Sequence, residues 1–165
     1  MPFTSDELSV RAVDDDTWEL LVALVYQGRD ERFVVPAGFR TDFASVPQAV
    51  QWLVPTTGRY TRSVVLHDWL CGDPLAEGRL SSHDVDGILR RVLREEGVPL
   101  VRRRLMWVGV RWGALVDPLR RPGWLRDAPA VVALSVLALP LVAPTLPVLV
   151  ALAVDRLFSG SPRRR

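Results

Sequence analysis

The stretch Gly58–Cys71, GRYTRSVVLHDWLC, decides how the rest of the chain is organised. Its apolar residues recur at helical spacing, which predicts a helix from about Tyr60 to Cys71 with a wide buried face. His67 and Asp68 interrupt that apolar run. A buried imidazole or carboxylate costs free energy unless it finds a partner. We therefore expect other segments of the chain to supply partners for these two side chains.

Length and composition restrict the classes of protein that need to be considered. The 165 residues fit one domain of ordinary size plus an appendage. A single cysteine, Cys71, excludes a fold held together by internal disulfides. All 21 basic residues are arginine, which is typical of a GC-rich, actinobacterial-type genome. The first residues have neither the basic nor the apolar region of a signal peptide, so we expect none.

Charge is distributed unevenly along the chain. Residues 1–50 hold nine acids and four arginines, a net charge of −5, and the remainder holds ten acids and seventeen arginines, a net charge of +7. A basic C-terminal half favours a phosphate-bearing partner, either anionic lipid or nucleic acid. The arginines adjoin an apolar segment, so nucleic acid is the weaker interpretation.

That apolar segment, Pro129–Val154, contains no charged residue and lies between Asp127 and Asp155. It is long enough to cross a bilayer, but three prolines would break a helix near its middle. We expect a kinked crossing or a re-entrant hairpin over residues 129–157, and hence a membrane-associated protein. Arginines flank both ends, so the positive-inside rule gives no orientation. The prolines are Pro140, Pro144 and Pro147.

The N-terminal part is typical of a β-hairpin. Trp18–Tyr26 is rich in Leu and Val and predicts a strand, Gln27–Asp30 a turn, and Arg32–Val35 the returning strand. We expect the polar residues 1–16 to be flexible. After the hairpin, Ser45 is placed to cap a short helix, Pro47–Leu53.

Two further helices are predicted after the central one. Residues 73–80 predict a polar loop that we expect to act as the rim or the lid of a site. Ser81 and Asp84 have capping-box spacing, and the helix that follows places Asp86 close to its apolar stripe. A helix from about Pro99 to Val116 mixes arginine with tryptophan, which suits either a membrane surface or a solvated face with a packed inner side.

These elements predict an α+β fold, with an N-terminal β-hairpin or small antiparallel sheet packed on three to four helices and a C-terminal hydrophobic membrane segment. The expected organisation is a flexible N-terminus, a core domain, an arginine-containing linker, the membrane segment and a basic tail. Their bounds are 1–16, 17–117, 118–128, 129–157 and 158–165.

The residue types suggest a hydrolytic site. A histidine held by a carboxylate on a neighbouring helix is a general base, which gives His67 with Asp86 as its orienting partner. Asp68 points about 100° away around the helix and is a candidate metal ligand, with Asp42 as a second one. The alternative is that these side chains are buried polar groups bonded to the backbone, and that Asp42 is a loop carboxylate bonded to nearby N–H groups.

Several motifs resemble a phage- and prophage-associated bacterial domain family of unknown function. They are GFRTDFASVP (residues 38–47), GRY (58–60) and LHDWL (66–70), with Asp86 in a following helix. The resemblance covers roughly residues 33–113 and adds Ser45, Arg59 and Tyr60 to the candidate site. It implies no activity. Two features depart from the family. Val85-Asp86-Gly87-Ile88 replaces the usual Ala-Asp-x-x-Phe, and the charge-free run near the C-terminus is not part of the common domain.

A weaker resemblance links His67-Asp68 and the later Asp86 to the secreted calcium-dependent phospholipases. It implies that His67 deprotonates water, that Asp86 orients His67, and that Asp68 helps to bind a divalent metal such as calcium. The disulfides and a clear glycine-rich calcium loop are absent. Phosphohydrolases named for a His-Asp motif are a further option, for which two histidines are too few.

The leading hypothesis is a membrane-anchored hydrolase of the bilayer surface, most simply a lipid esterase that uses His67 and Asp86, with membrane lipid as partner. The alternative is a non-catalytic phage-derived assembly or interaction module that is attached to the membrane and binds a phage-type protein partner. In that case His67, Asp68 and Asp42 are structural.

Overall fold

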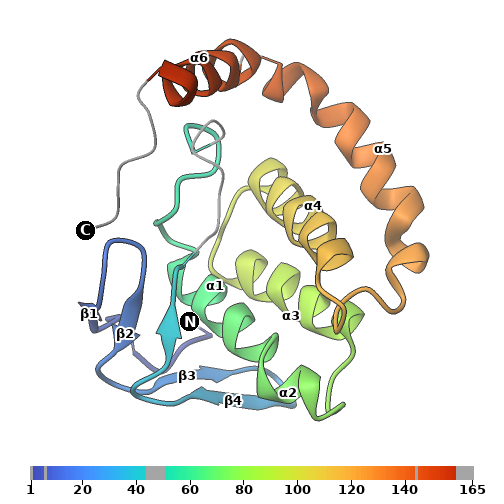
Figure 1. Cartoon of the computed structure of the whole chain (residues 1–165). Coiled ribbons are helices and arrows are strands. Elements are labelled where there is room, and N and C mark those ends of the chain that lie inside the picture. Colours follow the sequence, from blue (N-terminus) through green and yellow to red (C-terminus); the bar gives the residue numbers. More distant parts are fainter. Residues whose placement is uncertain (1, 6, 44–50, 144, 159–165) are drawn as a thin grey trace.

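The computed structural model describes residues 2–5, 7–43, 51–143 and 145–158, which form an α+β fold with two small antiparallel sheets beside a group of helices (Figure 1). Ser45 and the first residues of the predicted Pro47–Leu53 helix lie outside the described residues, and residues 51–53 form a turn.

The two sheets use short strands from the first 41 residues. One has the order β1-β2-β5, and the other is the hairpin of β3 and β4. The bounds are β1 Val10–Ala12, β2 Trp18–Leu20, β3 Leu24–Gln27, β4 Arg32–Val35 and β5 Arg40–Thr41. In the hairpin Leu24 pairs with Val35 and Gln27 with Arg32, which confirms the predicted hairpin. Leu24, Tyr26 and Val35 are buried at alternate positions, as expected for a sheet with one face on a core.

The prediction of one strand over Trp18–Tyr26 was wrong, because the chain turns after Leu20. Leu21 and Val22 are exposed, and the residues on either side join different sheets. The Leu20 N–H donates to the Phe39 carbonyl, 2.9 Å away, and the Leu21 N–H to the Ser9 carbonyl at 2.9 Å. Both hydrogen bonds stabilise this turn. The apolar composition of Trp18–Tyr26 does not predict the turn, because it depends on these distant partners.

The N-terminal residues take part in the fold. Phe3 forms an isolated bridge with Tyr26 and is buried in the core, with the two rings edge to face. Val10–Ala12 is strand β1, paired with β2. The described part of the segment that we expected to be flexible thus supplies a strand and a core side chain.

Four helices follow the sheets. They are α1 Thr61–Leu70, α2 Asp73–Ala76, α3 Ser82–Glu95 and α4 Leu100–Val116. Three of them, α1, α3 and α4, were predicted. The capping box at α3 is confirmed, since Ser81 Oγ accepts from the Asp84 N–H at 3.2 Å and Asp84 Oδ2 accepts from the Ser81 N–H at 3.2 Å. The residues 73–80, expected as a polar loop, instead contain α2, whose Pro74 and Leu75 are buried.

The core lies between the hairpin and the helices α1 and α3. Its members include Tyr26 and Val35 from the strands, Leu66 from α1 and Val92 from α3. A second cluster joins α1 and α3 to Met106 of α4. Helix α1 is therefore covered on one side by strands and on the other by helices, which leaves its polar residues in a largely apolar environment.

Two apolar helices complete the chain, α5 Trp124–Val142 and α6 Thr145–Phe158. Figure 1 shows α5 running along α4, and α6 continuing from its far end. One stretch, Trp124–Leu141, is long and apolar enough to cross a membrane, by length and composition, and most of it is exposed. Helix α4 packs against both α3 and α5, with Trp107 buried and Trp112 exposed.

Candidate functional site

His67 lies on the face of α1 that packs against α3. The residues around it, Val65, Leu66 and Leu70, are buried, and only 5% of His67 is exposed. Its position in the middle of α1 follows from the apolar pattern, because the residues one helical turn away on the same face also point inward. The sequence therefore forces a titratable ring into a packed helix interface.

The structure brings His67 and Asp86 together. His67 Nε2 lies 2.7 Å from Asp86 Oδ1, and Asp86 is only 1% exposed. The carboxylate accepts the proton of Nε2, so Nδ1 carries the lone pair in the neutral ring. This is the tautomer that a base acting through Nδ1 requires.

Two arginines share the Asp86 carboxylate with His67. Arg111 Nη1 donates to Oδ2 at 2.8 Å, and Arg120 Nη2 donates to Oδ1, also at 2.8 Å. Burial alone would raise the pKa of Asp86, but the hydrogen bond and charge of His67, with Arg120 and Arg111, outweigh it and lower the pKa below its usual value. Asp86 is thus an ionised carboxylate with three donors.

Arg111 connects this carboxylate to α5. Its side chain is fully buried, its Nη1 also donates to Ser82 Oγ at 2.9 Å, and its Nε lies 3.1 Å from Asp127 Oδ2. The same Asp127 oxygen is 3.0 Å from His83 Nδ1. The charges of α3, α4 and α5 therefore form one continuous network that includes the dyad.

Asp68 is half-buried and faces the end of β5 instead of α3. The Thr41 hydroxyl donates to Asp68 Oδ2 at 2.6 Å, and Thr41 Oγ1 accepts from the Phe43 N–H at 3.0 Å. Burial raises the pKa of Asp68 to about 7; the Thr41 hydrogen bond opposes this rise, and the charge of Asp42 adds to it. Asp42 and Asp68 thus lie in one neighbourhood, where their negative charges repel each other.

Cys71 lies one turn after His67, with its Sγ 3.9 Å from Nδ1. Burial raises the pKa of the thiol to about 12, with the neighbouring carboxylates Asp86 and Asp68 adding to the rise against Arg120. A thiol with that pKa is protonated at neutral pH, and the thiolate is the nucleophilic form. Cys71 is therefore not a suitable nucleophile, although it lies directly beside the base.

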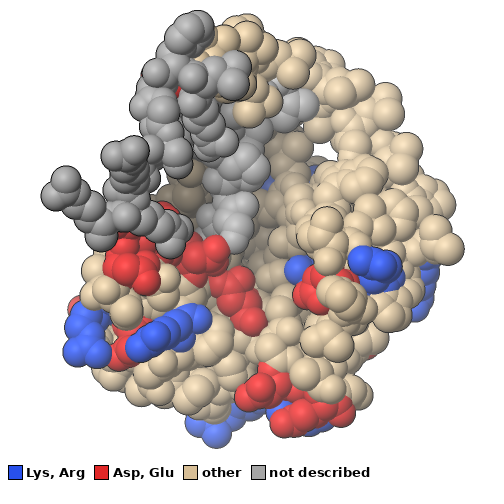
Figure 2. All heavy atoms as spheres, viewed as in Figure 1, with Lys and Arg blue, Asp and Glu red and all other residues tan. Residues whose placement is uncertain are grey.

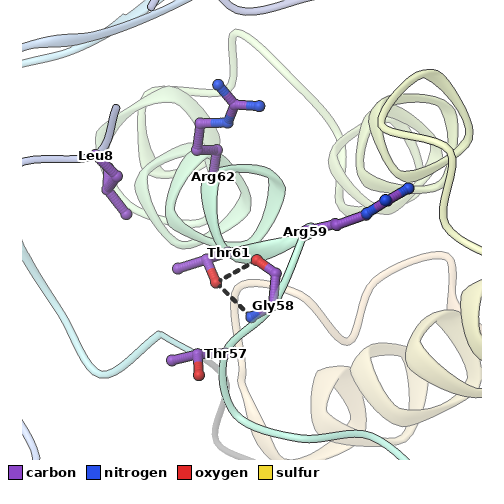
Figure 3. Close-up of a pocket in the computed structure, with 6 residues that line it drawn as sticks. All are labelled: Leu8, Thr57, Gly58, Arg59, Thr61 and Arg62. Carbon is purple, nitrogen blue, oxygen red and sulfur yellow. Dashed lines mark hydrogen bonds between the residues drawn. The ribbon is translucent and has the colours of Figure 1, made fainter. Parts of the chain in front are cut away.

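Arg59 and Tyr60 lie away from the dyad. Tyr60 is buried in the second core cluster and its hydroxyl donates to the Pro55 carbonyl, which is a packing role. Arg59 is exposed and lines a shallow pocket of about 350 Å³ at the start of α1, with Thr57 and Arg62 among the other lining residues (Figure 3). In that pocket Thr61 Oγ1 bonds both the N–H and the carbonyl of Gly58, each at 2.8 Å.

The sequence did not identify several residues of the network. Arg111 could have been noticed, because it lies one turn after buried Trp107 and one turn before buried Ala114, so it interrupts an apolar face. Arg120 and Asp127 had no local signal, since each lies more than 30 residues from the partner it meets on α3. Thr41 lies within the GFRTDFASVP motif, but nothing in the sequence predicted its hydrogen bond to Asp68.

The described residues contain no group of three or more His, Cys, Asp or Glu side chains close enough to hold a metal ion. Asp68 and Asp42 remain two candidate carboxylate ligands. Calcium takes six to eight oxygens, so backbone carbonyls and water would have to supply most of them.

Comparison with known proteins identifies the segment that carries this site. Residues 18–110 match the model of a family described as a protein of unknown function, DUF1353. The chain belongs to the DUF1353 family. The matched DUF1353 segment contains His67, Asp68 and Asp86, whereas Arg111, Arg120 and Asp127 follow it. No curated protein matches the chain, and no solved structure does.

Proposed function

We propose that the protein is a hydrolase of ester bonds at a membrane surface, with His67 as general base and Asp86 as its orienting partner. The observation that supports this most directly is the 2.7 Å contact between His67 Nε2 and Asp86 Oδ1, which leaves the lone pair on Nδ1. A carboxylate that fixes the ring and its tautomer is the usual arrangement for a histidine base.

The proposed reaction requires only groups that the chain supplies and one water molecule. Nδ1 of His67 takes a proton as the water oxygen attacks the ester carbonyl, and the same proton returns to the leaving alcohol when the C–O bond breaks. Asp86 stays ionised throughout, because Arg111 and Arg120 hold its charge. Cys71 Sγ lies 3.9 Å from Nδ1 and 3.7 Å from Nε2, and His67 is buried, so the side chains around the ring must move for water to reach Nδ1.

Asp68 and Asp42 repel each other, and a divalent cation bound between the two carboxylates would reduce that repulsion. Burial and the repulsion from Asp42 raise the pKa of Asp68, because both disfavour its ionised form. A bound cation would favour the ionised form and so offset both effects. Hard carboxylate oxygens suit calcium. Such an ion, when bound, would supply a Lewis acid that polarises the ester carbonyl.

The test is turnover of a fluorescent phospholipid ester in vesicles by the full chain, with and without calcium. His67→Asn should reduce turnover by about 100-fold or more, because general-base catalysis contributes that much. Arg104→Gln is the control, since Arg104 is exposed on α4 and outside the network, and it should retain turnover. If His67→Asn has the activity of the wild-type protein while both are folded by circular dichroism, the hydrolase proposal fails.

A second candidate is a non-catalytic phage-derived interaction module. The burial of the dyad and the saturation of Asp86 by three donors favour this alternative, because such a network also holds helices in register. It predicts that His67→Asn lowers stability while no ester substrate is turned over by either protein. A pull-down with phage structural proteins would then identify the partner.

A further inference from the structure

Helix α5 has two apolar faces in different surroundings. Asp127, Val131 and Ala138 face α4 and are buried, with Val131 packed on Trp107 and Val108. The opposite stripe is exposed although it is entirely apolar. Its members are Leu125, Val132, Val136 and Leu139, spaced so that they lie along one side of the helix.

The start of α5 is held to α4 by buried charge. Asp127 is paired with the fully buried Arg111 at 3.1 Å, and Trp124 Nε1 donates to the Arg111 carbonyl at 2.6 Å. Separating the two helices would leave Arg111 without this carboxylate, and breaking a buried ion pair is strongly unfavourable. This end of α5 therefore stays on the domain.

The helix beyond this anchor is too short to cross a bilayer. Residues 128–142 at about 1.5 Å per residue reach roughly 22 Å, against a hydrocarbon core of about 30 Å. The apolar part of α6, Leu146–Asp155, is shorter still. Neither helix alone spans a membrane once Asp127 is excluded from the span.

Charge and exposure on this side of the molecule suit a lipid surface. Arg121 and Arg126 are exposed at the start of α5, and the exposed apolar residues continue on α6 with Leu146 and Val150. In Figure 2 charged side chains gather over the lower half of this face, while the described surface along the upper part of α5 shows none. Arginine beside exposed aliphatic side chains favours an anionic interface.

We propose that α5 lies in the plane of an anionic bilayer surface, with its outer stripe among the lipids and its inner face still packed on α4. The whole domain would then be held close to the headgroups. This proposal rests on the membrane-surface part of the proposed function and deepens it, but it does not depend on any turnover, so a loss of binding and a loss of hydrolysis are measured separately.

The first test measures binding of the full chain to phosphatidylglycerol vesicles. Val136→Asp, on the exposed stripe and 58% exposed itself, should weaken binding by at least about tenfold, because it places a charge among lipids. Val22→Asp is the matched control: Val22 is 64% exposed but lies beside the strands, so binding should be unchanged. Arg126→Glu should weaken binding to the vesicles. The affinity of this variant should also change less with salt concentration than that of the wild-type protein.

The second test separates an in-plane helix from a crossing one. Nitroxide labels on single cysteines at Val132, Val136 and Leu139 should have the same depth in the bilayer, just below the headgroups. Depth that increases steadily along these positions would show that α5 crosses or enters the core, and would overturn the proposal. Failure to bind vesicles, with concentration-dependent dimers lost in Val136→Asp, would assign the stripe to a second copy and also overturn it.

Discussion

Asp86 determines what His67 can do. In a dyad of one histidine and one carboxylate, the carboxylate fixes which ring nitrogen carries the proton. Here Arg111 and Arg120 already balance the negative charge of that carboxylate at 2.8 Å each. Asp86 therefore acts on His67 by fixing the orientation and tautomer of the ring.

Asp68 gives the protein a pH dependence of stability that can be measured without any substrate. Its pKa is raised from 3.8 to about 7 in the folded state, so the folded protein binds more protons than the unfolded chain between these values. Its contribution therefore makes the free energy of unfolding fall as pH rises from about 4 to about 7. Urea denaturation at pH 5, 6, 7 and 8, with a chelator present, measures this slope.

Asp68→Asn is the comparison for that experiment, because the amide oxygen still accepts from Thr41 but cannot ionise. The difference in unfolding free energy between the two proteins should shift in favour of the variant by up to about 1.4 kcal/mol per pH unit over this range. A difference that does not change between pH 5 and pH 8 would contradict the raised pKa.

At this scale the sequence predicted the pairing of His67 with Asp86 but not the arginines around it. The pairing follows from two helices that must pack on each other, since α1 is buried at most of its positions and α3 has one apolar face, and each has a titratable residue among its buried side chains. Arg111 and Arg120 meet Asp86 only because α4 and the residues after it fold back over α3. Nothing in local spacing encodes that return.

Among the elements, helices were easier to predict than strands. Helix α1 is a mostly apolar run followed by Gly72 and Pro74, and α3 has a periodic pattern and a capping box, so the ends of both were close to the expected ones. The strands β2 and β3 have three and four residues, too few for alternation to show where one ends. The turn at Leu21 and Val22 depends on backbone bonds to distant residues, which residue type does not reveal.

Arg111 ties α3, α4 and α5 together, so its removal should loosen all three contacts. Arg111→Met keeps the length of the side chain but leaves Asp86 and Asp127 without their shared cation. Breaking a buried pair in this way costs about 3–5 kcal/mol. Chemical denaturation of the full chain should show a loss of that size in the free energy of unfolding.

Arg104→Met on the same helix is the control for this variant. Arg104 is exposed, so the same chemical change there should alter stability by no more than about 0.5 kcal/mol. Equal effects of the two substitutions would mean that the buried network adds nothing to the packing of the helices.

On the scale of the whole molecule, the segment shared with the family ends before the network is complete. The match covers residues 18–110, while Arg111, Arg120 and Asp127 lie beyond it. Trp107 and Val108 of α4 are buried against α5. This chain therefore depends on its C-terminal extension for part of its core as well as for its apolar surface.

A chain that ends at Asp117 should consequently be less stable than the full protein. It lacks Arg120 and Asp127 and exposes Trp107, so we expect the free energy of unfolding to fall by about 3 kcal/mol or more. A chain that ends at Val142 keeps α5 and should lie within about 1 kcal/mol of the full protein. Urea denaturation of all three in the same mild detergent compares them. If the shortest chain is as stable as the full one, α5 is only an anchor, and the contacts through Arg111 do not support the domain.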